Sequence, residues 1–152
     1  MGMKLKLLSL PAVLLCAAAF GQVKTIGIIG LDTSHSTAFT ELLNSDSDDP
    51  YAREFEVVAA YPYGSRVIES SYKRIPAYTE EVKKHGVEIV GSIAELCARV
   101  DYVMLETNDG HPHLEQALEV FKAGKTCYID KPVGATLGET IAIYELAEKY
   151  GT

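Results

Sequence analysis

Short apolar runs alternate with segments of helical periodicity along most of this chain, and this alternation restricts the fold more than any other feature. The runs that predict strands are residues 23–29, 55–61, 87–90, 102–105 and 126–129. The segments that predict helices are residues 34–44, 76–85, 92–98, 113–123 and 136–150. Buried strands joined through helices imply a parallel sheet covered on both faces. We therefore predict an α/β fold with a doubly wound parallel sheet, and a long irregular loop over residues 62–75.

The first 21 residues have a different pattern, which is typical of a secretory signal peptide. Lys4 and Lys6 precede an apolar stretch over residues 7–20, and Ala19-Phe20-Gly21 places small residues at the −3 and −1 positions of a cleavage site. We predict that residues 1–21 are a signal peptide and that the mature domain begins at Gln22.

Export without a lipid anchor is the interpretation that the N-terminal sequence favours. A buried N-terminal helix is the alternative, but Pro11 and the lack of a polar face argue against it. A lipoprotein signal needs a small residue before its cysteine, and Leu15 precedes Cys16. We expect residues 22–152 to be periplasmic or secreted.

The charge balance is acidic, with 14 Lys and Arg against 21 Asp and Glu and a net charge of −7. Loss of the two N-terminal lysines would leave 12 − 21 = −9, so a phosphate-backbone partner such as nucleic acid is not expected. Two cysteines would remain, Cys97 and Cys127, and two distant cysteines do not make a disulfide framework. We interpret both as small buried apolar residues, and their pairing stays open.

The carboxyl ends of parallel strands meet at one edge of the sheet, where ligands bind in α/β proteins. The segments that follow the strands are residues 30–35, 62–66, 107–113 and 130–133. Candidate functional residues are therefore sought in these four segments.

The segment after the first strand is an incomplete version of the glycine-rich dinucleotide motif. Its sequence is Gly30-Leu31-Asp32-Thr33-Ser34-His35, in which Asp32 and His35 replace the second and third glycines. The start of the following helix can still bind a phosphate through its N–H groups and dipole. The hydroxyls available there are those of Thr33, Ser34 and Ser36. The alternative is that Asp32 or Ser34 only caps the helix.

The second strand is not followed by the acidic residue that binds a ribose 2′-hydroxyl in NAD-dependent proteins. No acid occurs before Glu69, whereas Ser65 and Arg66 are placed to hold a 2′-phosphate, which favours NADP. The alternative is that Arg66 is an ordinary solvated arginine.

A metal site is also conceivable at this edge, because Asp32, His35, His111 and His113 all fall in the same loops. Metal ligands must converge on one point, however, and no histidine pair has helical spacing. His111-Pro112-His113 is a weak signal, so the sequence predicts no metal site.

Four motifs in the second half resemble the N-terminal half of the Gfo/Idh/MocA oxidoreductases, which include glucose–fructose oxidoreductase and inositol dehydrogenase. They are Thr107-Asn108, His113, Ala123-Gly124-Lys125 and Tyr128-Ile129-Asp130-Lys131-Pro132. The last of these resembles the family's Glu-Lys-Pro motif, with Asp in place of Glu. The resemblance covers residues 23–152 and implies a Rossmann-like fold.

This resemblance implies a nicotinamide cofactor, NADP or NAD, and hydride transfer with a sugar, polyol or related hydroxyl compound. It places Lys131 as the catalytic residue beside the nicotinamide and the substrate hydroxyl, where an ammonium stabilises a developing alkoxide. It places Thr107 and Asn108 at the nicotinamide ribose, and adds His113 and Asp130 to the cofactor site.

The same resemblance implies a second, C-terminal α+β domain that this chain lacks, so the chain alone is expected to bind cofactor at most. It also allows a homo-oligomer formed through that second domain. Two other functions stay open. One is an exported sugar-binding or scaffold protein that keeps the fold without redox chemistry, and the other is a phosphate-sugar binder that uses only the helix N-terminus.

Overall fold

The computed structural model describes residues 22–152, so the predicted signal peptide lies outside the described residues. The elements along the chain are β1 (Lys24–Ile29), α1 (Ser34–Asn44), η1 (Ala52–Glu54), β2 (Phe55–Tyr61), α2 (Glu69–Tyr72), α3 (Ile75–Lys84), β3 (Glu88–Ile89), α4 (Ile93–Cys97), β4 (Tyr102–Leu105), α5 (His113–Lys122), β5 (Thr126–Ile129) and α6 (Leu137–Tyr150). Within residues 22–152, no helix has the length and apolar character needed to cross a bilayer.

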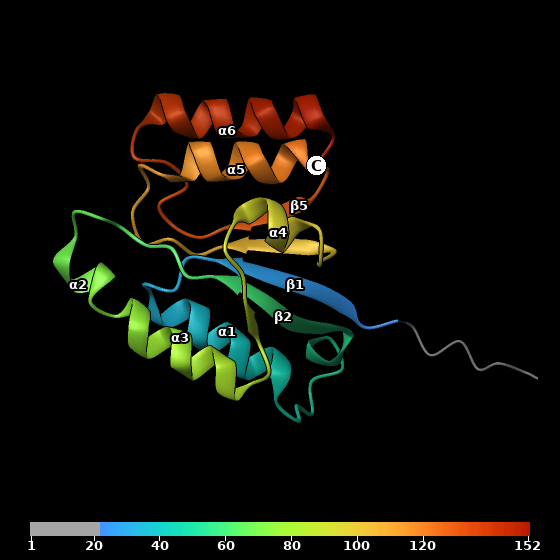
Figure 1. Cartoon of the computed structure of the whole chain (residues 1–152). Helices are drawn as coiled ribbons and strands as arrows, with labels where there is room; N and C mark the ends of the chain where they lie inside the picture. Colours follow the sequence, from blue (N-terminus) through green and yellow to red (C-terminus); the bar gives the residue numbers. More distant parts are fainter. Residues whose placement is uncertain (1–21) are drawn as a thin grey trace, which may run out of the picture.

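The five strands form one parallel sheet in the order β3-β2-β1-β4-β5, which confirms the predicted α/β, Rossmann-like class. The chain moves outward from β1 to β3 on one side and then crosses to β4 and β5 on the other. The point where this direction reverses lies between β1 and β4, and ligands bind there in doubly wound sheets. All carboxyl ends lie at the left of the sheet in Figure 1.

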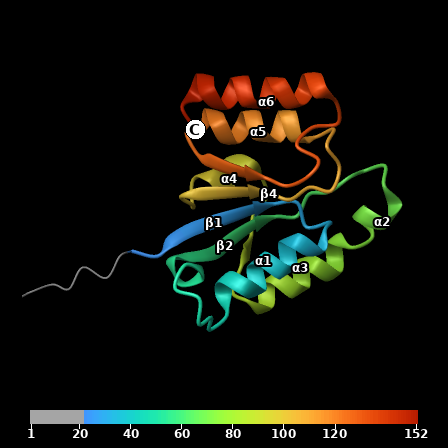
Figure 2. The same ribbon diagram turned by 180° about the vertical axis from the view of Figure 1, so that it is seen from behind.

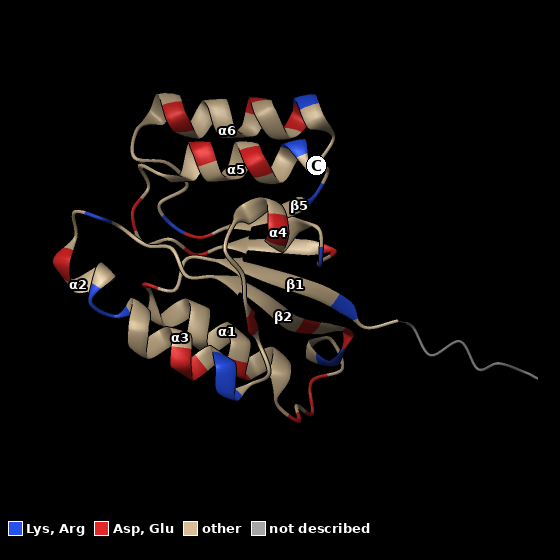
Figure 3. Ribbon diagram, in the orientation of Figure 1, with Lys and Arg blue, Asp and Glu red and all other residues tan. Residues whose placement is uncertain are grey.

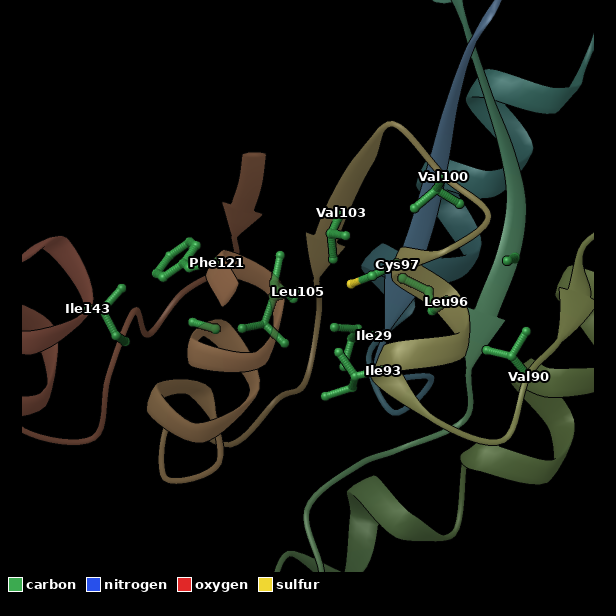
Figure 4. Close-up of a cluster of buried hydrophobic side chains, with 13 residues drawn as sticks. Ile29, Val90, Ile93, Leu96, Cys97, Val100, Val103, Leu105, Phe121 and Ile143 are labelled. Carbon is green, nitrogen blue, oxygen red and sulfur yellow. The ribbon is translucent and has the colours of Figure 1, made fainter. Parts of the chain in front are cut away.

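One face of the sheet packs against α4 and α5, and α6 packs against α5. Figure 4 shows Ile29, Val103 and Leu105 from the strands meeting side chains from these helices. Leu96 of α4 is fully buried, and a β-carbon at Gly27 of β1 would lie 2.5 Å from its Cδ2 atom. The absence of a side chain at residue 27 therefore lets α4 approach the strand closely.

The opposite face packs against α1 and α3, which lie side by side below β1 and β2 in Figure 1 and are seen from behind in Figure 2. Ile26 and Ile28 of β1 point to this face, whereas Ile29 points to the other, as the two-residue period of a strand requires. Asn44 at the end of α1 donates to the Val57 and His85 carbonyls and accepts from the Val57 N–H.

The helix limits agree closely with the sequence, with one correction. Ser92 and Thr136 cap α4 and α6 by accepting N–H bonds from the residues three positions on. The loop predicted over residues 62–75 is wrong in part, because it contains the short helix α2. Only four residues form that helix, too few to produce a helical period in the sequence.

Both described cysteines are free, and burial raises the pKa of each thiol. Cys97 is buried in α4, and Cys127 of β5 has a pKa of about 12 because of burial, with a smaller contribution from Cys97. The interpretation as a buried apolar residue is confirmed for Cys97, whereas Cys127 is only half-buried and packs against the edge of the core. Figure 3 shows acidic residues along α2, α3, α5 and α6, interspersed with single basic residues.

Candidate functional site

The loop after β1 begins at Gly30, where the backbone lies close to the segment that follows β4. Gly30 has φ +97°, and a β-carbon there would lie 2.4 Å from the backbone nitrogen of Thr107, which follows β4. Its N–H donates to the Tyr61 carbonyl at the end of β2. Glycine is therefore required here by both conformation and space, and the close approach brings the loops after β1, β2 and β4 together.

Asp32, which replaces the second glycine of the dinucleotide motif, points into the protein. Its two carboxylate oxygens accept from the Ser65 N–H at 2.9 Å and the Asn108 N–H at 3.1 Å, so one fully buried side chain links three loops. Burial raises the pKa of Asp32, and these N–H bonds oppose that rise. A carboxylate turned inward leaves the outer surface of the loop free of negative charge.

Thr33 caps α1, which corrects the alternative that gave this role to Asp32 or Ser34. Thr33 has extended backbone angles, and its Oγ1 accepts from the His35 N–H at 3.1 Å. Ser36 turns inward and donates to the Thr33 carbonyl, so it is not available to a ligand. Ser34 is exposed and His35 is half-buried, and the first turn contains no acidic residue.

The segment after β2 is organised by Ser65. Its buried hydroxyl donates to Asp109 and accepts from the N–H groups of Val67 and Ile68. Its hydroxyl is therefore used within the protein rather than turned toward a 2′-phosphate. Arg66, by contrast, is exposed, with its guanidinium 5.5 Å from the centre of the Tyr63 ring.

Asp109 also pairs with His111, whose Nδ1 lies 2.8 Å from the Asp109 Oδ1. Burial raises the pKa of Asp109, but the hydrogen bonds from the backbone and ring of His111 and from Ser65 outweigh it, so the net shift is downward. The same hydrogen bond raises the pKa of His111. This pair stabilises the loop before α5.

A cavity of 360 Å³ opens beside these loops, between the end of β2 and the starts of α4 and α5. Tyr61, Tyr63 and Arg66 line it on the β2 side, and Ser92 and Gln116 line it on the helix side. The Gln116 Oε1 accepts from the Thr107 hydroxyl, but its buried Nε2 donor has no partner. The polar and aromatic lining of this cavity suits a polar ligand such as an adenosine.

The segment after β4 is fixed by hydrogen bonds from the His113 side chain. This histidine is fully buried, with its Nε2 2.7 Å from the Thr107 carbonyl and its Nδ1 3.3 Å from the Val133 carbonyl. It therefore joins the loops after β4 and β5. Thr107 is also fully buried, and the Asn108 side chain donates to Ser71. In this conformation both residues make contacts within the protein.

Asp130 and Lys131 follow β5, and they differ in exposure. The Asp130 side chain is 6% exposed and lies 2.7 Å from the His35 Nδ1, while the 70% exposed Lys131 side chain lies 3.3 Å from the same carboxylate oxygen. Burial raises the pKa of Asp130, but bonds from Lys131 and His35 outweigh it and lower the pKa overall. Asp130 is thus a buried anion that orients an exposed ammonium at the sheet edge.

Glu106 is the site residue that the sequence analysis did not identify. It follows β4 directly, is fully buried, and has no hydrogen-bond partner for either carboxylate oxygen. Burial raises its pKa to about 7, with an added effect of Asp130 and an opposing one of Lys131. The available signal was a single acidic residue directly after the apolar run Tyr102–Leu105.

These residues fit a bound dinucleotide along the edge. A helix N-terminus without an acidic first turn follows a glycine of positive φ, as pyrophosphate binding requires. Arg66 follows β2, Gln116 of α5 lines the same cavity, and Lys131 follows β5. The fold and the edge together define a nucleotide-binding α/β domain.

The family follows from the sequence. Residues 24–152 match the family described as "Oxidoreductase family, NAD-binding Rossmann fold", and the chain therefore belongs to the Gfo/Idh/MocA oxidoreductases. This confirms the resemblance and the nicotinamide cofactor class. A comparison with curated proteins gave no match.

Solved structures share the fold. They include scyllo-inositol dehydrogenase from Lactobacillus casei with NAD(H) and scyllo-inositol (23% identity, TM-score 0.62, 86% of this chain and 34% of that one). Biliverdin reductase from Synechocystis with biliverdin and NADP+ matches at 20% identity and TM-score 0.63, over 86% and 36% of the two chains. The WlbA dehydrogenase from Chromobacterium violaceum with NADH and UDP-GlcNAcA matches at 18% identity and TM-score 0.65, over 88% of this chain and 34% of that one. The chain spans about a third of the length of these proteins.

Proposed function

We propose that this chain is the dinucleotide-binding part of an NAD(P)-dependent oxidoreductase that acts on a sugar, polyol or related hydroxyl compound. The observation that carries the proposal is the position of Lys131, an exposed ammonium held by the buried Asp130 carboxylate at the same sheet edge as the N-terminus of α1. The substrate class is supported by the family and by neighbours crystallised with scyllo-inositol and UDP-GlcNAcA.

When bound, the nicotinamide supplies a hydride acceptor or donor. Gly30 and the start of α1 would hold the pyrophosphate, Arg66 the adenosine end, and Lys131 the nicotinamide end. The Lys131 ammonium would then stabilise the negative charge that develops on a substrate hydroxyl oxygen. Asp130 would orient that ammonium, and His35 holds the Asp130 carboxylate through the contact at 2.7 Å.

Arg66 supports a preference for NADP. It is exposed, lies beside the Tyr63 ring, and lines the cavity at the end of β2, and the segment that follows β2 has no acidic residue before Glu69 to bind a free 2′-hydroxyl. The acidic residues of this cavity, Glu115 and Glu119, come from α5 on its other side. A guanidinium–phosphate contact contributes about 1.5–3 kcal/mol, which corresponds to about 10–100-fold in affinity.

The test is a calorimetric titration of NADPH and NADH into the purified wild-type chain and four variants. We expect Arg66→Ala to weaken NADPH binding about 10–100-fold and NADH binding little, and Lys131→Met to weaken both. Arg53→Ala, before β2, and Lys125→Met, before β5, are matched controls at the opposite edge, and both should bind like wild type. Equal NADPH binding by Arg66→Ala and wild type would refute the assignment of Arg66. Binding of inorganic phosphate, with no binding of either dinucleotide, would favour a phosphate-sugar binder.

Export is a second part of the proposal, supported by the basic start, apolar stretch and small-residue exit of residues 1–21. An exported enzyme of this kind must retain its dinucleotide tightly outside the cytoplasm. Intact-mass measurement of the protein from its native host should give a mature N-terminus at Gln22. A mass that includes residues 1–21 would contradict export by cleavage.

A further inference from the structure

Three potential metal ligands converge beside the dinucleotide edge. One atom from each of His35, Glu106 and Asp130 lies within 4.8 Å of the other two. His35 lies in the first turn of α1, which follows β1, and Glu106 and Asp130 lie directly after β4 and β5. The three residues are adjacent because of the strand order β1-β4-β5. Among residues 22–152, this is the one group of three that meets the spacing of a metal site.

Glu106 requires an explanation that the proposed dinucleotide site does not provide. Its side chain is fully buried, and neither carboxylate oxygen has a hydrogen-bond partner within the protein. A carboxylate buried without a partner is strongly unfavourable, and buried carboxylates are generally paired or bound to metal ions. It also lies next to a second buried carboxylate, that of Asp130, which increases the need for positive charge.

We propose that His35, Glu106 and Asp130 bind a divalent transition-metal ion of the zinc class. A neutral imidazole with two carboxylates supplies a charge of −2, which matches a divalent cation. An imidazole ligand favours zinc, iron or nickel over magnesium and calcium, which prefer oxygen ligands alone. The proposal differs from the sequence-based prediction of no metal site, which considered Asp32, His35, His111 and His113 but not Glu106 or Asp130.

Binding of one ion requires the ligand atoms to adjust, because they lie within 4.8 Å of one another rather than at the spacing of bound ligands. Ligand distances of about 2.0–2.2 Å place neighbouring ligands about 3–3.5 Å apart. The His35 Nδ1 and Asp130 Oδ2 atoms are 2.7 Å apart, so they must separate by less than about 1 Å to admit the ion. The His35 side chain is 42% exposed and can turn to allow this.

The neighbouring cation does not block the site. Lys131 contacts the same Asp130 oxygen, so a metal bound at this oxygen and the Lys131–Asp130 contact of the proposed function are alternatives. The Lys131 side chain is 70% exposed, so its ammonium can move into solvent when a metal is bound. Three protein ligands leave a fourth position open, as in catalytic zinc sites. A water or a ligand hydroxyl oxygen could occupy that position.

The test is a titration of Zn²⁺ into the chelator-treated, tag-free chain without dinucleotide, so its outcome is independent of NAD(P) binding. We expect one Zn²⁺ per chain, and an affinity loss of at least about tenfold in His35→Ala and in Glu106→Gln. His111→Ala is the matched control. His111 makes an equivalent contact with Asp109 at 2.8 Å, but this pair has no third ligand residue that completes a metal site. It should bind Zn²⁺ like wild type.

Cobalt(II) spectra provide the second readout, because they distinguish nitrogen and oxygen ligands from thiolates. The expected spectrum has the visible bands of a low-coordinate site without a thiolate charge-transfer band, which excludes Cys97 and Cys127 as the ligands. No Zn²⁺ binding by the wild type, unchanged binding by folded Glu106→Gln, or a thiolate spectrum would each overturn the proposal. Circular dichroism establishes that each variant is folded.

Discussion

Gly30→Ala tests whether the close approach of β1 and β4 organises the site, because two separate effects act at this position. A side chain at φ +97° is strained, and its β-carbon would lie 2.4 Å from the Thr107 nitrogen and 2.7 Å from its Cα. Both of these atoms belong to the backbone, so no rotation of a side chain relieves the contact. The sheet edge itself must move.

The magnitude can be worked out from a matched pair of glycines. Gly86 has φ +84°, but a β-carbon added there would meet no atom within 4 Å, so Gly86→Ala carries only the conformational cost of about 1–2 kcal/mol. Gly30→Ala carries the same cost and an overpacking cost of about 1–3 kcal/mol. We therefore expect a loss of about 2–5 kcal/mol at Gly30 and about 1–2 kcal/mol at Gly86.

Urea unfolding followed by circular dichroism measures the free energy of unfolding of both glycine variants. The slope of this free energy against urea concentration is compared between the variants. The difference between the two variants isolates the β1–β4 contact. Equal losses of unfolding free energy in Gly30→Ala and Gly86→Ala would refute the argument that this close approach is rigid.

Three further predictions concern stability and protonation. Asn44→Ala should lower the free energy of unfolding in urea by about 1–3 kcal/mol, because it removes three hydrogen bonds to backbone groups. A loss below about 0.5 kcal/mol, as expected of an exposed surface change, would contradict this prediction. Leu96→Ala should cost about 2–5 kcal/mol because it leaves a cavity between α4 and the sheet, and an unchanged urea midpoint would contradict that packing. His111 should titrate above 6.5 in an NMR experiment, and Asp109→Asn should lower the pKa of His111. Since the folded pKa of His111 is the higher one, its contribution to stability is present below pH 6.5 and is lost as pH rises through the folded value; an Asp109→Asn protein with an unchanged His111 titration would exclude the pair as the cause.

Most helices and strands could be predicted from the sequence because hydrophobic periodicity and capping residues depend only on neighbouring positions. The predicted limits of α1 and β2 match the structure, since hydroxyl residues precede the helix and an apolar run of seven residues forms the strand. α2 was missed because four mostly polar residues carry no periodic signal. Its position depends on the contact of Asn108 with Ser71, 37 residues apart in the chain.

The site was less predictable, because its contacts join distant loops. Several polar residues around Thr33 could have capped α1, and the choice follows from Asp32 being drawn to N–H groups 33 and 76 residues away. The role of Glu106 depends in the same way on strand order, which places it beside Asp130. Residue types alone indicate neither contact.

The central claim is that a nicotinamide dinucleotide binds along the carboxyl edge of the sheet. Hydrogen–deuterium exchange of the purified chain, with and without NADPH, tests it most directly. The account predicts slower exchange in residues 30–36, 62–66, 107–113 and 130–133, with unchanged exchange in α3 and in the outer turns of α6. No protection at saturating NADPH, or protection confined to segments away from this edge, would contradict it.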